Sequence, residues 1–191
     1  MQRFLANSKG YSLPELLITL TIFGILMAIA VPDFSRLSLK RQIDGESQKL
    51  YMDLMFARIT AIKNNNNVVV TFNQANNQYS IHDDTNSDGV VNGTETVKNV
   101  SLAPRVRFGF FGAGVVDPNG NPVTNAVTLT SGGNILTFNP RGEADNSGSV
   151  YLIPTSEIGQ SNLLLRAISV VQATGGVEYW EYNQGQIPLW I

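Results

Sequence analysis

The stretch KGYSLPELLITLTIFGILMAIAVP, residues 9–32, decides the architecture of this chain. It is an almost unbroken apolar run with a single carboxylate, Glu15, near its start. A charged side chain at the centre of a bilayer costs about 2.5–3.5 kcal/mol on insertion scales, and acidic residues at such depth are functional candidates by default. Glu15 therefore needs either a partner or a position close to water.

The apolar run is long enough to cross a membrane. The 19 residues from Leu13 to Val31 would form a helix about 28 Å long, against a hydrocarbon core of about 30 Å. A secretory signal peptide is the alternative, because Arg3 and Lys9 give a basic start and the segment 28–30, Ala-Ile-Ala, is typical of a cleavage site. The carboxylate and proline at the head of the run disfavour that alternative.

Composition sets the limits for the rest of the chain. The 191 residues, of which 43% are hydrophobic, are enough for one compact domain and an anchor. A formal net charge of -2 gives no general attraction to nucleic acid or to anionic lipid. The absence of cysteine excludes disulfides and thiolate metal sites.

The apolar pattern predicts one long helix from about Pro14 to Lys63. Beyond Pro32 the helix becomes amphipathic, with one row formed by Leu50, Leu54, Ala57 and Ala61. A helix of this length would measure roughly 75 Å, far more than a bilayer requires, so its second half must pack against a domain outside the membrane. Four asparagines at 64–67 end it, because asparagine favours turns.

The remainder of the chain predicts a β-rich domain. Short runs rich in Val, Thr, Phe and Tyr alternate with Asn, Gly, Asp and Pro clusters, at 68–72, 78–82, 96–102, 106–111, 126–129, 135–138, 150–153, 163–171 and 177–182. We expect two antiparallel layers with one face on the amphipathic helix. The predicted fold class is therefore α+β, a long N-terminal helix followed by an antiparallel β-sheet or sandwich head.

The start of the chain resembles the leader of type IV pilins and type II secretion pseudopilins. In that family a short basic leader ends in glycine and a glutamate is the fifth mature residue, as in Gly10, Tyr11 and Glu15 here. The resemblance implies that a prepilin peptidase cuts between Gly10 and Tyr11 and methylates the new amino group of Tyr11. Tyr11 departs from the usual phenylalanine, and Pro14 replaces a commoner aliphatic residue, although proline is tolerated in a helix's first turn.

The resemblance also implies roles for Glu15, Gly24 and Pro32. Glu15 would meet the N-terminal amine of a neighbouring subunit, so that both charges are neutralised inside an apolar bundle. The alternative is that Glu15 lies at the headgroup level. Both can be true at different times, with Glu15 at the headgroup level before assembly and paired afterwards. Gly24 and Pro32 both disfavour a continuous helix, which predicts either a break between them or a kink at the membrane exit.

A long helix before an all-β head resembles, more narrowly, the GspH/FimT group of minor pseudopilins and minor pilins. Residues 136–142, LTFNPRG, resemble a recurring strand–turn segment of the group, and residues 167–177 resemble its C-terminal hairpin. The resulting pilin-like division has a leader at 1–10, the N-terminal helix at 11–63 with its transmembrane half at 13–31, and a globular head at 64–191.

A metal site is predicted between two of the strands. Residues 84–95, DTNSDGVVNGTE, fit the twelve-residue calcium-loop template, with ligands at Asp84, Asn86, Asp88, Val90 (through its carbonyl), Asn92 (through a water) and Glu95. Calcium takes six to eight oxygen ligands, and Gly89 allows the sharp turn they need. The alternative is a hairpin connection of the same composition without an ion. Any affinity is expected near 10⁻⁴–10⁻³ M, roughly the extracellular range.

Other classes of function are disfavoured. His82 is the only histidine, which excludes triads and multi-histidine sites, and we expect it on the surface at a strand end. We therefore predict that the chain is not an enzyme. Some members of the group act as DNA receptors through an arginine-bearing C-terminal segment, but here residues 175–178 read Gly-Gly-Val-Glu, which disfavours phosphate contacts.

These observations favour a structural subunit of a type II secretion or type IV pilus filament, with a DNA-binding minor pilin as the alternative. The expected partners are other pilin or pseudopilin subunits, prepilin peptidase and the inner membrane, with no nucleic acid. The head would lie in the periplasm on a single-pass anchor before assembly. The apolar end at 189–191 would either cap the core or form a subunit contact.

Overall fold

The computed structural model describes residues 10–93, 95–112, 114–131, 133–160, 164–183, 185 and 189–191, without the side chains of residues 29–33. The chain divides into two compact units, one ending at Ser38 and the other comprising Leu39–Ile191, here called the head unit. The head unit thus begins inside the long helix, not after it as the predicted division at residue 64 assumed. The reason is that the second half of the helix is buried in the core of the head.

Helix α1 spans Leu13–Asn64, 52 residues, close to the predicted limits of Pro14 and Lys63. It begins after Ser12, whose Oγ accepts a hydrogen bond from the backbone N–H of Glu15 at 3.4 Å, an N-cap contact. It ends where Asn65 takes a left-handed conformation, with φ of 57°. Asparagine tolerates this conformation better than most residues, so the asparagine run stops the helix as expected.

The predicted break between Gly24 and Pro32 is absent from this structure, because α1 is helical through both residues. A proline removes one intrahelical hydrogen bond and a glycine costs about 1 kcal/mol relative to alanine. In this structure the two costs together do not separate the helix into two pieces. A break on assembly stays a prediction.

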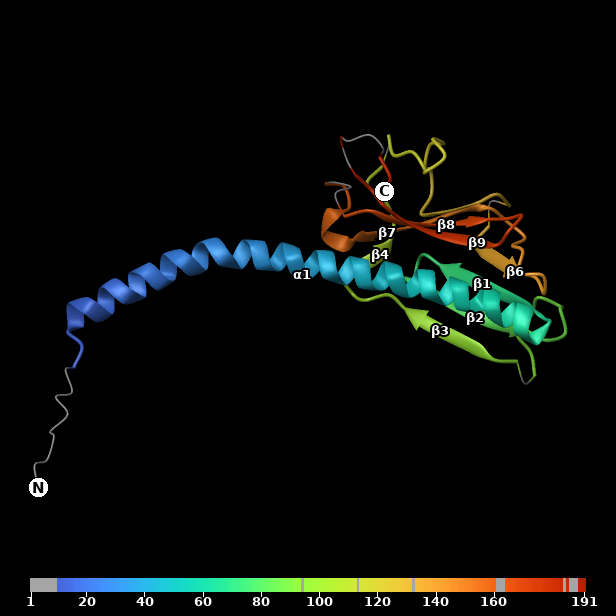
Figure 1. The fold of residues 1–191 in the computed structure, drawn as a ribbon, viewed down its shortest axis with the longest axis horizontal. Helices are drawn as coiled ribbons and strands as arrows, with labels where there is room; N and C mark the ends of the chain where they lie inside the picture. The colour runs from blue at the N-terminus through green and yellow to red at the C-terminus, as the bar shows by residue number, and fades with distance from the viewer. Residues whose placement is uncertain are drawn as a thin grey trace, which may run out of the picture. The chain divides into compact units, whose positions relative to one another are not determined.

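Each of the nine predicted runs contains a strand. The described strands are β1 (Asn67–Asn73), β2 (Gln78–Asp84), β3 (Val97–Ser101), β4 (Val106–Phe108), β5 (Val127–Leu129), β6 (Ile135–Phe138), β7 (Gly148–Pro154), β8 (Arg166–Val171) and β9 (Gly176–Glu181), with a 3₁₀ turn at Thr155–Glu157. They form two antiparallel sheets, which confirms the predicted α+β class with an antiparallel head (Figure 1). The first sheet has the order β3-β2-β1-β6, and the second has the order β4-β7-β8-β9 with β5 also paired to β7.

The main core of the head lies among α1 and the inner faces of both sheets. The helix contributes the predicted row, Leu50, Leu54, Ala57 and Ala61, each fully buried. A second, smaller cluster covers the opposite face of the second sheet, where Tyr151 and Leu165 pack with Val115, Val123 and Trp190. The second sheet is therefore covered on its inner face and on part of its outer face.

Two ion pairs join α1 to the two sheets. Asp53 accepts hydrogen bonds from the Tyr79 hydroxyl at 2.7 Å and from Lys98 Nζ at 2.6 Å, both in the first sheet. Asp44 accepts from Arg166 of β8 at 2.7–2.9 Å, and the arginine is 1% exposed. Arg166 is buried, so removing Asp44 would leave an uncompensated charge, whereas Lys98 is half exposed and its pair with Asp53 is worth less. Together the two pairs position the helix over both sheets.

Two glycines allow three segments to meet at the end of the head. Gly175 has φ of 59°, and a Cβ built on it would lie 1.9 Å from the carbonyl oxygen of Gly142. The same carbonyl accepts a hydrogen bond from Arg58 Nε of α1 at 2.9 Å. The segment LTFNPRG and the C-terminal hairpin thus contact each other and the helix, which explains in packing terms why glycine stands at both positions.

Gly175→Ala is expected to destabilise the head more than Gly159→Ala. Both positions have positive φ, at which a side chain costs about 1–2 kcal/mol, but only Gly175 also faces a backbone carbonyl. Overpacking adds about 1–3 kcal/mol. Thermal unfolding of the full chain in detergent measures both variants, and equal losses of melting temperature would contradict the packing argument.

Candidate functional site

The N-terminal site residues lie at the exposed start of α1. Tyr11 is 84% exposed and Gly10 has no heavy atom within 4 Å of the place where a Cβ would stand. Glu15 is exposed in the first turn, where a carboxylate is favourable next to the positive end of the helix dipole. The Ser12–Glu15 contact is a role for this segment that the sequence reasoning did not identify, although the S-x-x-E spacing signals it.

The first half of α1 exposes apolar side chains on every face. The fractional exposure is between 47% and 75% for each of Leu13, Leu16, Leu17, Ile18, Leu20, Ile22, Phe23, Ile25, Leu26 and Met27. Soluble monomers rarely leave a contiguous apolar surface of this size uncovered. This surface therefore marks a region that lies in lipid or against other protein.

Among the described residues, no helix satisfies the length and apolarity required of a membrane span. The predicted span at 13–31 includes residues 29–31, whose side chains lie outside the described part.

A second apolar stripe runs along α1 within the head unit. Met52, Phe56 and Ile59 are spaced i, i+4 and i+7 and are 64%, 59% and 54% exposed. They point away from the buried row that holds the core, since helix positions separated by about half a turn lie on opposite faces. The helix thus presents an uncovered apolar face even where its other face is fully packed.

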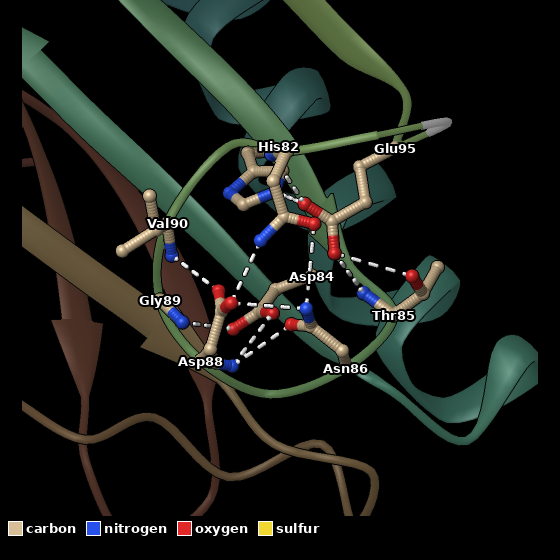
Figure 2. Close-up of polar contacts among 9 residues, drawn as sticks. His82, Asp84, Thr85, Asn86, Asp88, Gly89, Val90 and Glu95 are labelled. Atoms are coloured by element: carbon tan, nitrogen blue, oxygen red, sulfur yellow. Dashed lines mark hydrogen bonds and ion pairs between the residues drawn. The ribbon is translucent and has the colours of Figure 1, made fainter.

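The predicted calcium loop is held by its own side chains, as Figure 2 shows. Asp84, at the end of β2 and 2% exposed, accepts hydrogen bonds from the backbone N–H groups of Asp88 and Gly89 at 3.1 and 2.9 Å. Asp88 Oδ1 accepts from Val90 N–H at 2.8 Å, and Gly89 has φ of 72°. Asp88 Oδ2 accepts from the amides of Asn86 and Asn92 at 2.9 and 2.7 Å. Four of the six predicted ligand residues, Asp84, Asn86, Asp88 and Asn92, are therefore joined by direct contacts.

Glu95, the predicted twelfth-position ligand, closes the base of the loop. Its Oε1 accepts from the N–H and hydroxyl of Thr85, both at 3.1 Å, and its Oε2 accepts from Asn92 N–H at 3.0 Å. Oε2 also lies 2.8 Å from Nε2 of His82. One possible ligand atom from each of His82, Asp84 and Glu95 lies within 4.8 Å of the others. The donors present, mostly oxygen, suit a hard cation such as Ca²⁺.

His82 is buried, at 4% exposure, so the expectation of a surface residue was wrong. The side chain of His82 lies under the loop, where it contacts Glu95, instead of facing solvent at the strand end (Figure 2). A lone histidine near a strand end gives no sign of this contact. Glu95, thirteen residues later, reaches the histidine across the base of the loop, next to the pairing of β2 with β3.

The C-terminal segment caps the smaller core cluster. Trp190 is 6% exposed, its Nε1 donates to the carbonyl of Val116 at 2.8 Å, and it pairs with Tyr182 in an isolated bridge. Ile191 is 63% exposed. The tryptophan therefore serves the core, which was one of the two roles expected for the apolar end.

Comparisons with known proteins agree with the leader and with the head. The model of the prokaryotic N-terminal methylation motif matches residues 5–31, and the model of the family described as Type II transport protein GspH matches residues 46–173. The chain belongs to the GspH family. The predicted resemblance to GspH-type minor pseudopilins and pilins is thereby confirmed, including the N-terminal methylation motif.

Solved structures with similar folds include two minor subunits. The minor pseudopilin EpsH from the type 2 secretion system of Vibrio cholerae is 14% identical over 76% of this chain and 99% of its own, with a TM-score of 0.48. The type IV minor pilin FimU of Pseudomonas aeruginosa is 12% identical over 72% of this chain and 87% of its own, with a TM-score of 0.49. No curated protein sequence matches the chain.

The DNA-receptor alternative gains no support from the C-terminal hairpin. Gly175 is packed against Gly142, and Glu178 is the exposed charged residue of the segment that would need cations for phosphate.

The contacts of Glu95 predict a specific pH dependence. The backbone N–H of Asn92, followed by His82 and Thr85, lowers the pKa of Glu95 from 4.5 to about 2. A carboxyl whose pKa is lower in the folded state stabilises the fold above its unfolded pKa, and this contribution is lost as the pH falls from 4.5 toward 2. Glu95→Gln should therefore be less stable than wild type at neutral pH and lose less stability across that interval.

Urea unfolding of the full chain in a chelator, repeated between neutral pH and pH about 2, measures the effect. Glu178→Gln, which changes an exposed carboxylate on β9, is the control. Parallel stability curves for wild type and Glu95→Gln would contradict the prediction.

Proposed function

We propose that the chain is a minor pseudopilin or pilin, a structural subunit of a type II secretion or type IV pilus filament that assembles through α1. The observation that carries this proposal is the apolar surface that α1 leaves exposed along residues 13–27 and again at Met52, Phe56 and Ile59. Burying apolar surface stabilises by about 25 cal/mol per Å² removed from water, so these two surfaces favour contact with lipid and then with other subunits.

The leader and the anchor define the first steps of the mechanism. Prepilin peptidase would cut between Gly10 and Tyr11 and methylate Tyr11, consistent with the methylation motif at residues 5–31. The apolar half of α1, predicted as a span at 13–31, would then hold the chain in the inner membrane with the head unit in the periplasm. Tyr11 and Gly10 are accessible to a peptidase because Tyr11 is 84% exposed and no described atom lies close to Gly10.

Glu15 would supply the specificity of the assembly step. Its carboxylate is exposed in the first turn of α1, and among the described residues it takes part in no ion pair. In a bundle of such helices an unpaired carboxylate is costly, whereas one paired with the amine of a neighbouring Tyr11 is tolerated. Subunits would therefore stack only in the register that brings an amine to each carboxylate.

Processing at Tyr11 is the most direct test of the proposed class. We expect the protein extracted from membranes of a host with prepilin peptidase to begin at a methylated Tyr11, because the leader residues fit the peptidase and Glu15 lies five residues into the mature chain. Intact mass spectrometry measures this, and Gly10→Glu should retain the whole leader. An N-terminus at Val31 would instead establish a signal peptide and overturn the proposal.

We also propose that the loop from Asp84 to Glu95 binds Ca²⁺ weakly. Asp84, Asn86, Asp88 and Asn92 are already in mutual contact, and rotation of the Asn92 amide would present its oxygen beside Asp88. Both oxygens of Glu95 already accept hydrogen bonds within the loop, so an ion would compete with these contacts, which supports weak binding better than tight. Bound calcium would brace the connection between β2 and β3.

Calcium should raise the melting temperature of the full chain. With a dissociation constant of about 1 mM, about 10 mM Ca²⁺ stabilises the fold by about 1.4 kcal/mol, or roughly 3–5 °C. Asp88→Asn keeps one of the two hydrogen-bonding oxygens but removes the charge, and it should abolish the shift. Asp117→Asn, in another loop held by an aspartate, is the matched control. An unchanged melting temperature of the wild type at millimolar Ca²⁺ would contradict the proposed calcium site.

A further inference from the structure

A row of polar side chains, two of them serines, crosses the second sheet on the face away from α1. Ser149 of β7 pairs with Ser169 of β8, and Ser169 pairs with Glu178 of β9, so the three lie side by side on adjacent strands. In the next row Tyr151 and Trp180, which are much larger than the serines, flank Ala167. Small residues beside large ones leave a depression in the sheet surface.

The loop at residues 117–121 overhangs this depression and turns it into a groove. The groove has a volume of about 400 Å³ and is lined by Asp117, Asn119, Ser149, Ser169, Glu178 and Trp180, among others. That volume lies within the range of about 300–1,000 Å³ typical of small-molecule sites. Figure 1 shows the segment between β4 and β5 beyond the second sheet, on the side opposite α1.

The polar groups of the groove are held in place by the fold. Asp117 is occupied within its own loop, where Oδ1 accepts from the N–H groups of Asn119 and Asn121 at 2.9 and 2.8 Å. Ser169 Oγ accepts from Trp180 Nε1 at 2.6 Å, which fixes the indole and leaves the serine hydroxyl hydrogen to donate elsewhere. Asn119 and Glu178 are exposed, so an amide and a carboxylate are available to a ligand.

The charge of the groove selects against anions. None of the described residues that line it is lysine or arginine, while Asp117 and Glu178 contribute carboxylates. Phosphates and nucleic acids require cationic contacts and would be repelled. A neutral ligand with many hydroxyl groups fits better, because amide, hydroxyl and carboxylate groups pair with hydroxyls and an indole face packs on apolar C–H groups.

From these observations we infer that the groove binds a neutral oligosaccharide, with one sugar ring against Trp180 and its hydroxyl groups on Asn119 and Glu178. The site lies on the face of the sheet opposite α1, so it does not depend on the helix contacts proposed for assembly. A filament subunit with this groove would attach its head to a glycan surface or carry a glycan as cargo.

Intrinsic fluorescence tests the inference, because Trp180 and Trp190 are the chain's two tryptophans. The probes are cellohexaose, maltohexaose, mannohexaose and N-acetylchitohexaose, added to the full chain in a detergent without a sugar headgroup. We expect a saturable change with at least one of them. Asn119→Ala should weaken it about tenfold, equivalent to about 1.4 kcal/mol, and Trp180→Phe should remove most of the fluorescence response. Asn99→Ala, an exposed position on β3, should behave as wild type.

Calorimetry with the same probes separates loss of binding from loss of the reporter in Trp180→Phe. The absence of saturable binding to all four oligosaccharides would overturn the inference, as would undiminished binding in Asn119→Ala. Binding of heparin or of an oligolysine peptide in preference to the neutral sugars would also overturn it, because the groove would then recognise charge. None of these outcomes affects the test of processing at Tyr11, so the two proposals fail separately.

Discussion

The packing of one helix row against two sheets is the constraint on which the head depends. The row consists of four fully buried residues, Leu50, Leu54, Ala57 and Ala61, and residues of both sheets share one core cluster with them. The ion pairs of Asp44 and Asp53 fix the rotation of the helix, since each reaches a different sheet. With its inner face committed to the core, α1 has only its outer face and its first half left for other partners. The same helix therefore serves stability and assembly with different residues.

The outer surfaces of α1 differ from those of an ordinary surface helix. A helix on a soluble monomer places polar residues toward water, whereas here Phe56 and its neighbours in the stripe are more than half exposed. Residues 13–28 are apolar all round apart from the two threonines, Gly24 and the first-turn glutamate. Exposing this apolar surface to water is unfavourable, and the cost disappears only when lipid or other subunits cover it. This is the physical basis for assembly into a filament.

Much of the fold could be predicted because its signals are local. The long apolar helix, its asparagine end and the nine β-runs each depend on neighbouring residues, and all appear in the structure. The start of the compact head at Leu39 could not be predicted, because it depends on which helix residues the sheets cover. The break expected between Gly24 and Pro32 does not appear in this structure, because helix α1 continues through both residues.

In the candidate sites, too, the features made by neighbouring residues could be predicted and those made by distant residues could not. The spacing of Asp84, Asn86 and Asp88 defines a turn that the sequence alone places correctly. Glu95 contacts His82 across the base of the loop, next to the pairing of β2 with β3. No pattern in the neighbouring residues therefore predicts that the histidine is buried or that the glutamate contacts it. The groove beside Trp180 is likewise made by three strands and a distant loop, and no linear motif announces it.

The central claim is that the carboxylate at the start of the helix is satisfied by another subunit. The most direct measurement is the amount of Glu15→Ala and of Glu15→Asp in sheared filaments, relative to wild type, with the N-terminus of each protein established by mass. The account predicts that Glu15→Ala is trimmed normally and is nearly absent from filaments, while Glu15→Asp retains part of the wild-type level. Wild-type incorporation of correctly trimmed Glu15→Ala would contradict it.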